Sequence, residues 1–335
     1  MMIKYAKQDL PLSKEDTQRR VNNVERVLVT GGAGFIGSHL VDRLVEDHDV
    51  VVLDDLSGGN LSNIQKHIDK KRITFIHGSI TSEDDVRKAL EGVTMVFHFA
   101  AQPDVRLSTA EPMTDFNVNM KGGMVLLEGL RKYDVNKIVF ASSGGTVYGD
   151  SKTFPTREDK PLAPISNYGA AKCAFEMYLS SYSELYGINA ISLRLANIIG
   201  PRLKHGVIFD LYNKINRNPS HLEVLGTGMQ EKAYMEVSDT IEAISLLTPL
   251  IKTGFLPINL SSGESLTVSR IAQILCEELS FPLTKIKFTG TERGWAGDVL
   301  VTDLDISRLK SFGWKPKKSI EESVRNYIRW IVKFN

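Results

Sequence analysis

Between residues 24 and 195, short apolar runs alternate with longer amphipathic stretches. The apolar runs predict strands at Arg26–Thr30, Val50–Asp54, Ile73–Ile76, Met95–Phe99, Lys137–Ala141 and Ala190–Leu195. The amphipathic stretches predict helices at Gly37–Asp47, Ser82–Leu90, Met113–Tyr133 and Asn167–Tyr186. Because continuous apolar strands separated by helices are typical of sheets covered on both faces, we expect an α/β fold with a doubly wound parallel sheet of the Rossmann type.

Beyond Gly200 the alternation becomes irregular, although Thr240–Leu250 and Leu256–Leu260 look like a helix and a strand that return to the first sheet. Further helices are predicted at Val268–Leu279, Ser307–Phe312 and Ile320–Phe334. We expect three parts: a polar N-terminal arm at residues 1–23, a Rossmann domain at 24–195 with returns at 237–262, and a smaller, mixed C-terminal substrate-binding lobe at 196–335.

The 335-residue chain has 41 Lys and Arg against 40 Asp and Glu, a formal net charge of +1. This balance argues against a protein that coats nucleic acid or an anionic membrane, because either needs a basic excess. Only two cysteines occur, which excludes a disulfide scaffold, and the polar start lacks the apolar region of a signal peptide. No apolar run has the length of a membrane helix, and no histidine shows metal-ligand spacing. We expect a soluble, cytoplasmic protein without a metal and without nucleic-acid or membrane partners.

The segment VLVTGGAGFIGSHL places Gly31, Gly34 and Gly37 between a predicted strand and a predicted helix. Glycines at such a turn let backbone N–H groups approach a pyrophosphate, which the helix N-terminus also attracts. Asp54 ends the second strand, 17 residues after Gly37, where a carboxylate can hold a ribose hydroxyl pair. A structural turn and a strand-end cap are the simpler alternatives, but the combined spacing favours a dinucleotide site. A carboxylate repels a 2′-phosphate, and residues 54–60 hold no Arg or Lys, so we expect NAD rather than NADP.

Tyr168 and Lys172 stand four residues apart at the start of a predicted helix, so their side chains share one helical face. A free phenol has a pKa of about 10 and is a poor base at neutral pH. A neighbouring ammonium, helped by a positive nicotinamide ring, would stabilise the phenolate and lower that pKa. A surface tyrosine beside a lysine is more frequent in general, but the dinucleotide site earlier in the chain favours a catalytic pair.

Several motifs occur in the order of a known family: TGGAGFIG, HFAA at His98–Ala101, SSGGTVYGD at Ser142–Asp150, YGAAK at Tyr168–Lys172 and LRLANIIGPR at Leu193–Arg202. With them the chain resembles the extended short-chain dehydrogenase/reductases, and among these the nucleotide-sugar epimerases of the UDP-glucose 4-epimerase type. The later segments GTGMQEKAY, INLSSGESLTV, RGWAGDV and FGWKPKKSIEES extend the resemblance over nearly everything after residue 24.

The resemblance implies a role for each matching residue. Tyr168 is the expected base, and Lys172 is expected to tune it and to hold the nicotinamide ribose. The other residues expected to contact NAD are Gly31, Gly34, Phe35, Ile36, Gly37, Asp54, Phe99, Ala100, Ala101 and Asn119. The residues expected to bind the sugar nucleotide are Asn197, Lys232, Arg293 and Thr302. The resemblance also implies a homodimer formed by the helices at 113–133 and 167–186, although burial in the core would give the same apolar stripe.

The chain departs from the family pattern next to the expected base. Gly144 occupies the position that usually carries the Ser or Thr of the catalytic triad, so Ser143 or Thr146 must substitute. Related dehydratases and decarboxylases tend to carry acidic residues at the positions of Gly145 and Thr146, which favours epimerisation here. Thr302 is small where a bulky Tyr often lies beside the sugar, which leaves room for an N-acetyl group.

Together these observations favour NAD-dependent 4-epimerisation of a nucleotide sugar through a transient 4-keto intermediate. The expected substrate is a UDP-hexose such as UDP-glucose, UDP-galactose or UDP-N-acetylglucosamine. Two alternatives stay open: another nucleotide-sugar reaction (dehydration, decarboxylation or oxidation) and a non-catalytic NAD-binding regulator. The sequence does not decide the sugar, the nucleotide base or the role of residues 1–23.

Overall fold

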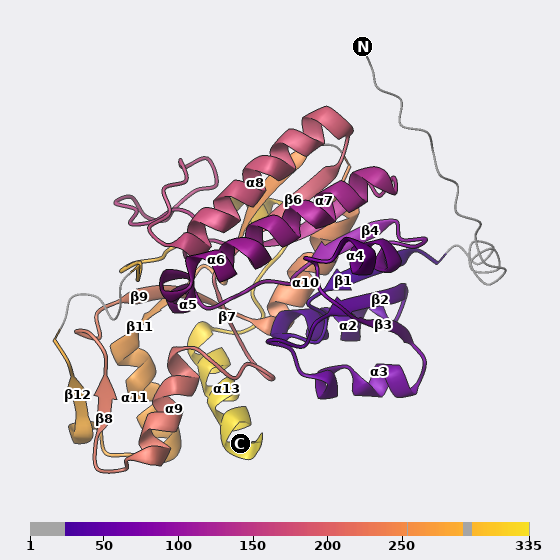
Figure 1. Cartoon of the computed structure of the whole chain (residues 1–335). Coiled ribbons are helices and arrows are strands. Elements are labelled where there is room, and N and C mark those ends of the chain that lie inside the picture. Colours follow the sequence, from indigo (N-terminus) through magenta and orange to yellow (C-terminus); the bar gives the residue numbers. More distant parts are fainter. Residues whose placement is uncertain (1–23, 253, 291–296, 335) are drawn as a thin grey trace.

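The computed structural model describes residues 24–252, 254–290 and 297–334. Seven parallel strands form the central sheet, in the order β10-β6-β5-β4-β1-β2-β3 (Figure 1). They are β1 (Arg26–Thr30), β2 (Asp49–Asp54), β3 (Ile73–His77), β4 (Met95–His98), β5 (Lys137–Ser143), β6 (Asn189–Leu195) and β10 (Phe255–Leu260). The expected doubly wound parallel sheet is therefore confirmed. The order of the strands reverses between β1 and β4, and in such sheets the crevice beyond the carboxyl ends at this point binds ligands.

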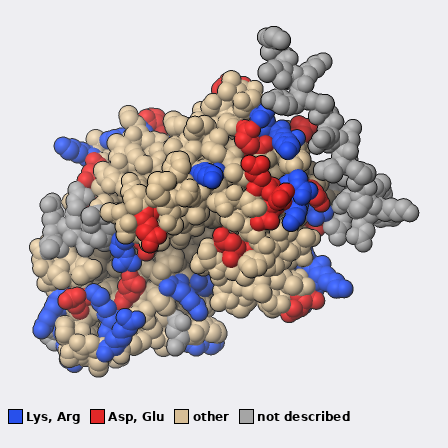
Figure 2. Space-filling model, in the orientation of Figure 1, with Lys and Arg blue, Asp and Glu red and all other residues tan. Residues whose placement is uncertain are grey.

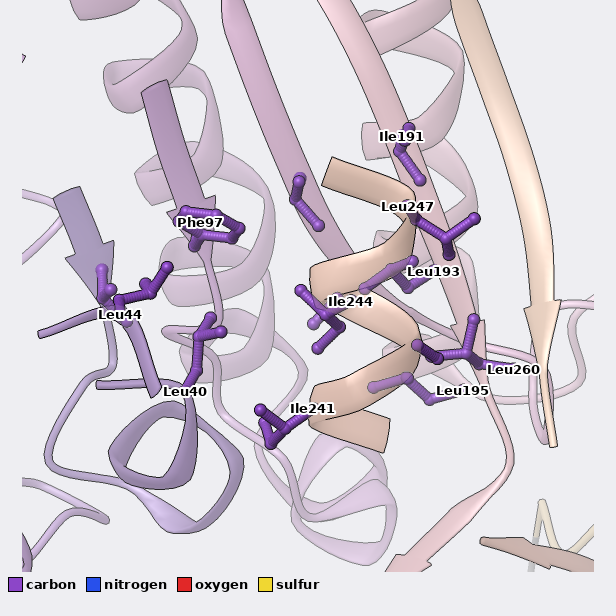
Figure 3. Close-up of a cluster of buried hydrophobic side chains, with 14 of the residues drawn as sticks. Leu40, Leu44, Phe97, Ile191, Leu193, Leu195, Ile241, Ile244, Leu247 and Leu260 are labelled. Atoms are coloured by element: carbon purple, nitrogen blue, oxygen red, sulfur yellow. The ribbon is translucent and has the colours of Figure 1, made fainter. Parts of the chain in front are cut away.

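Helices cover both faces of the sheet. On one face lie α2 (Phe35–Leu44), α3 (Gln65–Asp69), α10 (Val237–Leu247) and α12 (Ser307–Ser311). On the other lie α4 (Glu83–Ala89), α7 (Gly123–Lys132) and α8 (Asn167–Tyr186). Figure 3 shows Ile244 of α10 between the β-sheet residue Leu193 and Leu40 of α2, all of them fully or nearly fully buried. This packing explains why the sheet strands carry apolar residues at consecutive positions.

The later part of the chain forms smaller sheets with a core of their own. β7 (Asn197–Ile199), β9 (Glu231–Glu236) and β11 (Ser265–Thr267) make one sheet, and β8 (Leu222–Val224) pairs with β12 (Ile286–Phe288). Three helices pack with these strands: α9 (Val207–Arg217), α11 (Val268–Leu279) and α13 (Ile320–Phe334). The short remaining elements are η1 (Leu61–Asn63), α5 (Val105–Ala110), α6 (Pro112–Asp115), η2 (Phe116–Gly122), η3 (Thr248–Leu250) and η4 (Leu283–Lys285).

Two segments of the chain bear on elements expected from the sequence: the strand β10 and the helical run from α6 to α7. β10 pairs in parallel with β6, with Ile258 opposite Leu193, so the chain returns to the first sheet at this strand. The helix expected at Met113–Tyr133 is present as one continuous helical run of α6, η2 and α7, in which η2 has π-helical rather than α-helical turns. The spacing of apolar residues along the chain does not distinguish an α-helical turn from a π-helical turn, because in both cases similar residues face the core.

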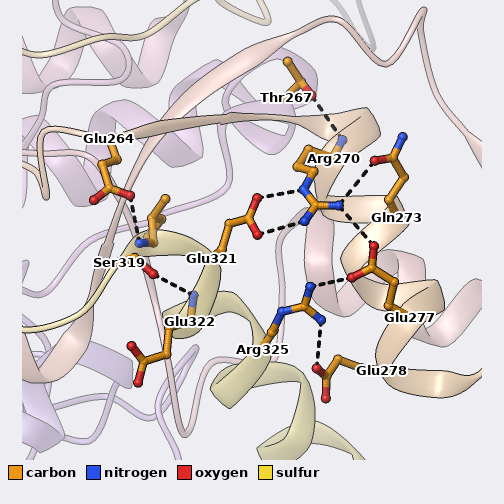
Figure 4. Close-up of polar contacts among 11 residues, drawn as sticks. Glu264, Thr267, Arg270, Gln273, Glu277, Glu278, Ser319, Glu321, Glu322 and Arg325 are labelled. Carbon is orange, nitrogen blue, oxygen red and sulfur yellow. Dashed lines mark hydrogen bonds and ion pairs between the residues drawn. The ribbon is translucent and has the colours of Figure 1, made fainter.

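Charged side chains are spread over the surface in both signs. On the face shown in Figure 2, acidic and basic residues are interspersed, as the near-zero net charge implies. In the second lobe they join α11 to α13: Arg270 binds Glu321 at 2.7 and 2.8 Å, and Arg325 binds Glu277 and Glu278 (Figure 4). Within the residues described, no helix has both the length and the apolar character of a membrane span.

Candidate active site

The glycine-rich turn lies at the carboxyl end of β1, beside the point where the strand order reverses. Gly31 has a φ of +70°, and a Cβ there would lie 2.6 Å from the backbone nitrogen of Ala100. A side chain at this position is therefore excluded by conformation and by space. α2 begins after Gly34 without any side-chain cap, so its N-terminus presents backbone N–H groups and a positive dipole end. This arrangement fits the pyrophosphate of a dinucleotide.

Asp54 ties the glycine-rich turn to the end of β2. Its carboxylate accepts hydrogen bonds from the backbone N–H groups of Ala33, at 2.9 Å, and Leu56, at 2.8 Å. Burial raises the pKa of this carboxyl group, and the two backbone hydrogen bonds oppose the rise. The opposite wall of the turn is Phe99–Ala101, which is half-buried and follows directly after β4. The expected cofactor residues thus converge on the same end of the sheet.

Tyr168 and Lys172 lie in the first turns of α8, which Ser166 caps by accepting a hydrogen bond from the N–H of Gly169 at 3.1 Å. The Lys172 ammonium donates to the backbone oxygen of Ala141 in β5 at 3.0 Å and lies 5.5 Å from the centre of the Tyr168 ring. The side chain of Ser143, the last residue of β5, interacts with the Tyr168 hydroxyl and lowers the pKa of its phenol. The structure therefore brings Ser143, Tyr168 and Lys172 together.

The protein residues alone do not give Tyr168 a low pKa. Burial raises the pKa of its phenol, the negative charge of Asp115 raises it further, and the hydrogen bond with Ser143 lowers it. Burial also lowers the pKa of Lys172 to about 8, while Asp115 and Glu176 oppose this change. Burial is the largest of these effects on the phenol, and the expected lowering of its pKa by the ammonium is not among them. The positive charge of a bound nicotinamide acts in the direction that the phenolate needs.

Steric crowding explains why residue 144 is a glycine. A Cβ there would lie 2.6 Å from Cδ1 of Leu304 and 2.8 Å from the backbone oxygen of Arg194. Of the two expected substitutes for the missing Ser or Thr, Ser143 contacts Tyr168. The hydroxyl of Thr146 is buried and has no hydrogen-bond partner among the described residues.

Sequence reasoning missed a buried polar cluster behind the catalytic helix. Arg194 of β6 holds Glu176 of α8, with 2.7 Å between Nη2 and Oε2, and also donates to the Tyr148 hydroxyl at 2.8 Å. Ser142 donates to the same carboxylate. An arginine inside an apolar strand and a glutamate four residues after Lys172 were the available signals, because a buried charge requires a partner.

A second group of missed residues surrounds Asn119. Its amide oxygen accepts from the N–H of Gln102 at 3.0 Å, and its NH₂ group donates to the Gln102 oxygen at 3.0 Å and to Asp115 at 2.8 Å. Both N–H groups are therefore used inside the protein, where they brace the segment after β4. Gln102 also donates to Asp115 at 3.1 Å.

Three of the four expected sugar-nucleotide residues meet around Ala233 of β9. Asn197 donates to the Ala233 oxygen at 3.3 Å, and the Thr302 hydroxyl accepts from the Ala233 N–H at 3.0 Å. The neighbouring Lys232 forms an ion pair with Asp298 at 2.8 Å. Thr302 is only 5 % exposed, and its hydroxyl braces β9 through this hydrogen bond. Arg293 lies outside the described residues.

These features define an enzyme site of the Rossmann type with a Ser-Tyr-Lys group beside a dinucleotide cradle. The model of the NAD dependent epimerase/dehydratase family matches residues 27–255, and the chain belongs to that family. The expected resemblance to extended short-chain dehydrogenase/reductases of the nucleotide-sugar group is confirmed, and NAD is the cofactor of the family.

Relatives with different reactions are similar to the chain. A putative UDP-glucose 4-epimerase of Methanocaldococcus jannaschii is 36% identical, over 92% of this chain and 99% of the relative. The structure of a UDP-glucose 4-epimerase of Thermotoga maritima with UDP-glucose is 35% identical, with a TM-score of 0.83 and coverage of 92% and 99%. DesIV, a dTDP-glucose 4,6-dehydratase of Streptomyces venezuelae with NAD bound, is 27% identical, with a TM-score of 0.85 and coverage of 92% and 97%. The family includes both epimerases and dehydratases.

Proposed function

We propose that the protein is an NAD-dependent 4-epimerase of a UDP-hexose. The observation that carries the proposal is the contact of Tyr168 with Ser143 in a site where Gly145 and Thr146 occupy the positions of the dehydratase acids. The relatives at 35–36% identity that are described as UDP-glucose 4-epimerases support it. The dinucleotide is proposed to bind the 24–195 part of the chain and the sugar nucleotide the lobe at 196–335.

In the proposed mechanism Tyr168 removes the proton of the sugar 4-hydroxyl, and Ser143 holds that hydroxyl by a hydrogen bond. Bound NAD would supply the hydride acceptor and donor chemistry at C4 of the sugar. Lys172 keeps a positive charge beside the phenolate. The 4-keto sugar rotates in the site so that its opposite face is presented, while its diphosphate stays anchored near Asn197 and Lys232. Tyr168 then returns the proton to the oxygen at C4, which now has the inverted configuration. No net oxidation occurs, so the cofactor is not consumed.

The proposal disfavours dehydration for a chemical reason. Elimination of water from the sugar needs an acid and a base in addition to the tyrosine. Gly145 has no functional side chain, and the hydroxyl of Thr146 is a poor proton donor and acceptor at neutral pH. Asp115 and Glu176 are the two carboxylates that act on Lys172. Both are at most 1 % exposed, and other residues hold them. Neither is free to transfer a proton to a substrate.

The residues proposed to contact NAD are Gly31, Gly34, Phe35, Ile36, Gly37, Asp54, Phe99, Ala100 and Ala101, with Tyr168 and Lys172. A homodimer is also proposed. Its support is a group of large apolar side chains on α6, η2 and α8 that are 49 to 67 % exposed: Met113, Phe116, Met177, Leu185 and Tyr186. Exposed apolar residues grouped on neighbouring helices are typical of protein–protein contacts. Sedimentation of the purified protein at several concentrations tests this state.

Proton NMR of the anomeric region tests the reaction. The purified protein, with NAD supplied, is mixed in separate samples with UDP-glucose, UDP-galactose, UDP-N-acetylglucosamine and UDP-glucuronic acid. The expected result is one sugar and its C4 epimer approaching the same ratio from either side. Signals of a 4-keto-6-deoxy sugar, loss of carbon dioxide or stoichiometric NADH would instead assign one of the alternative reactions. No change with any sugar would contradict the epimerase proposal for this panel.

A further inference from the structure

The end of α5 meets the start of α8 through two hydrogen bonds to Ser108. The Ser108 hydroxyl accepts from the backbone N–H of Tyr168 at 3.1 Å, and the Ser108 carbonyl oxygen accepts from the side-chain amide of Asn167 at 2.8 Å. Ser108 is fully buried, and its hydroxyl also donates to the backbone oxygen of Val105 at 2.7 Å. One residue of α5 therefore holds two consecutive residues at the start of the candidate catalytic helix.

Both hydrogen bonds use backbone groups for which the two helices have no partner of their own. The first N–H groups and the last carbonyl groups of an α-helix lack a partner within the helix. Tyr168 is the second residue of α8, so its N–H is one of these groups. The Ser108 carbonyl would accept from the N–H four residues later, but that residue is Pro112, which has no N–H. The end of α5 and the start of α8 therefore satisfy each other.

The same short helix is attached to the candidate cofactor site. The segment Phe99–Ala101 forms one wall of that site, and Gln102 follows it directly. The side-chain amide of Gln102 donates to the backbone oxygen of Asp104 at 2.9 Å, and Asp104 is the N-cap of α5. The wall of the cofactor site and the backbone of Tyr168 are thus held at the two ends of α5.

We infer that Ser108 is a positioning residue, which fixes Tyr168 relative to the wall of the cofactor site. It is not proposed to touch the substrate or the cofactor, because it is fully buried. The inference rests on the proposed function in one respect: it takes Tyr168 as the group that exchanges the proton with the sugar. The rate of such a step depends steeply on the placement of the reacting groups, so a looser start of α8 slows the chemical step and leaves sugar binding unchanged.

The first test is amide hydrogen exchange of the NAD-loaded protein, which needs no substrate. Ser108→Ala removes the acceptor of the Tyr168 N–H. Exchange in a peptide that covers residues 166–171 is expected to become about fivefold faster or more, while a peptide that covers residues 175–186 keeps its wild-type exchange. Unchanged exchange at the start of α8 would overturn the inference, whatever reaction the protein catalyses.

The second test separates kcat from KM with the sugar nucleotide that the NMR panel identifies. Ser108→Ala is expected to lower kcat by about tenfold or more and to leave KM within about twofold of wild type. Wild-type kinetics, or a raised KM with unchanged kcat, would overturn the inference. A wild-type protein that converts no sugar would overturn the proposed function and with it the catalytic role of the contact, whereas the exchange test would still report the contact itself.

Thr267→Ala is the matched control. Thr267 is the N-cap of α11 in the second lobe, where its hydroxyl accepts from the N–H of Arg270 at 3.1 Å. The variant removes a hydroxyl that satisfies the start of a helix, as Ser108→Ala does, but far along the chain from Tyr168. It is expected to keep the wild-type kcat. An equal fall of kcat in both variants would mean that any loss of a helix cap slows the enzyme, and would contradict a specific role of Ser108.

Asn167→Ala removes the other hydrogen bond of the contact and keeps the Ser108 hydroxyl. Asn167 is exposed, so this variant is expected to fold even if Ser108→Ala does not, and it is also expected to lower kcat without changing KM. Because both residues hold the same contact, the loss of kcat from Asn167→Ala is expected to be smaller in the Ser108→Ala background than in wild type. Fully additive losses would show that the two residues act independently and would overturn the inference.

Discussion

The guanidinium of Arg194 holds the carboxylate of Glu176 directly behind the candidate catalytic helix, and both side chains are almost completely buried. This contact joins β6 to α8 one turn beyond Lys172. The position of the catalytic pair relative to the sheet therefore depends on an ion pair that no substrate reaches.

Breaking that ion pair is expected to be strongly destabilising. Glu176→Gln leaves the arginine without its counter-ion, and loss of one partner of a buried pair costs about 3–5 kcal/mol of unfolding free energy. Urea unfolding followed by circular dichroism measures it. Glu321→Gln is the control, because the ion pair of Glu321 with Arg270 is at the surface, where such pairs contribute about 0–1 kcal/mol. Similar losses of unfolding free energy in the two variants would contradict the expected difference between the buried and the surface ion pair.

Restoring a serine at the usual position of the triad is expected to harm the protein. Gly144→Ser places a Cβ against Leu304 and the Arg194 backbone, and overpacking of this kind costs about 1–3 kcal/mol. Gly145→Ser is the matched control, because the nearest atom to its added Cβ is the Ser143 hydroxyl at 4.0 Å. Thermal unfolding of the two variants measures the difference. A Gly144→Ser protein as stable as wild type would show that the strand end moves freely.

Replacing Tyr168 with phenylalanine is expected to reduce kcat by about 10²–10⁴-fold, because the proton of the sugar hydroxyl loses its acceptor. The cofactor is expected to stay bound, since the glycine-rich turn and Asp54 are unchanged. Enzymatic determination of released NAD checks retention, and NMR of the substrate checks turnover. Activity close to wild type would remove Tyr168 from the mechanism.

Asp54 is expected to determine the preference for NAD. Asp54→Ala removes both the proposed ribose contact and the hydrogen bonds to the N–H groups of Ala33 and Leu56. We expect the affinity for NAD to fall by about tenfold or more and the affinity for NADP to fall less, since the repulsion of a 2′-phosphate is also lost. Calorimetric titration with each dinucleotide measures the two changes. Equal losses of affinity for NAD and NADP would mean that Asp54 only stabilises the glycine-rich turn and does not select the cofactor.

The ion pairs between α11 and α13 predict a small acid-sensitive part of the stability. Hydrogen bonds from Arg325 and Arg270 lower the pKa of Glu277 below its usual 4.5. A carboxyl group with a lowered pKa in the folded state stabilises fully above its unfolded pKa and loses this contribution as pH falls through the folded value. Arg325→Met is therefore expected to flatten the fall in stability below about pH 4.5, by less than about 1 kcal/mol. Unfolding midpoints at pH 3.5 and pH 7 test it, and an unchanged pH dependence would contradict it.

Local signals made much of the fold predictable. The helix at Asn167–Tyr186 begins and ends where the sequence predicts, because Ser166 is an N-cap and Gly187 adopts a left-handed conformation with φ of 69°. The strands were equally clear, since residues buried on both sides of a sheet are apolar at consecutive positions. The π-helical turn was not predictable, because α-helical and π-helical turns carry a similar apolar pattern.

The residues of the candidate site were predictable only where they stand at a characteristic sequence distance from each other or from the end of a strand. Tyr168 and Lys172 share a helical face, and Gly31 and Asp54 have fixed distances from strand ends. The buried pair of Glu176 and Arg194 has no such spacing, because its two residues come from α8 and β6. The difference between Ser143 and Thr146 likewise required the three-dimensional surroundings of their hydroxyl groups.

The pairing of β10 with β6 has a consequence for how the protein is made. While the chain is being synthesised, β6 is complete at Leu195, but its partner begins only at Phe255. Until then the nascent sheet ends in an open apolar edge, which is the kind of surface that pairs with other chains and aggregates. A fragment that stops at residue 195 would keep that edge permanently. Expression of the dinucleotide half alone therefore calls for a chaperone or for the missing strand supplied as a separate peptide.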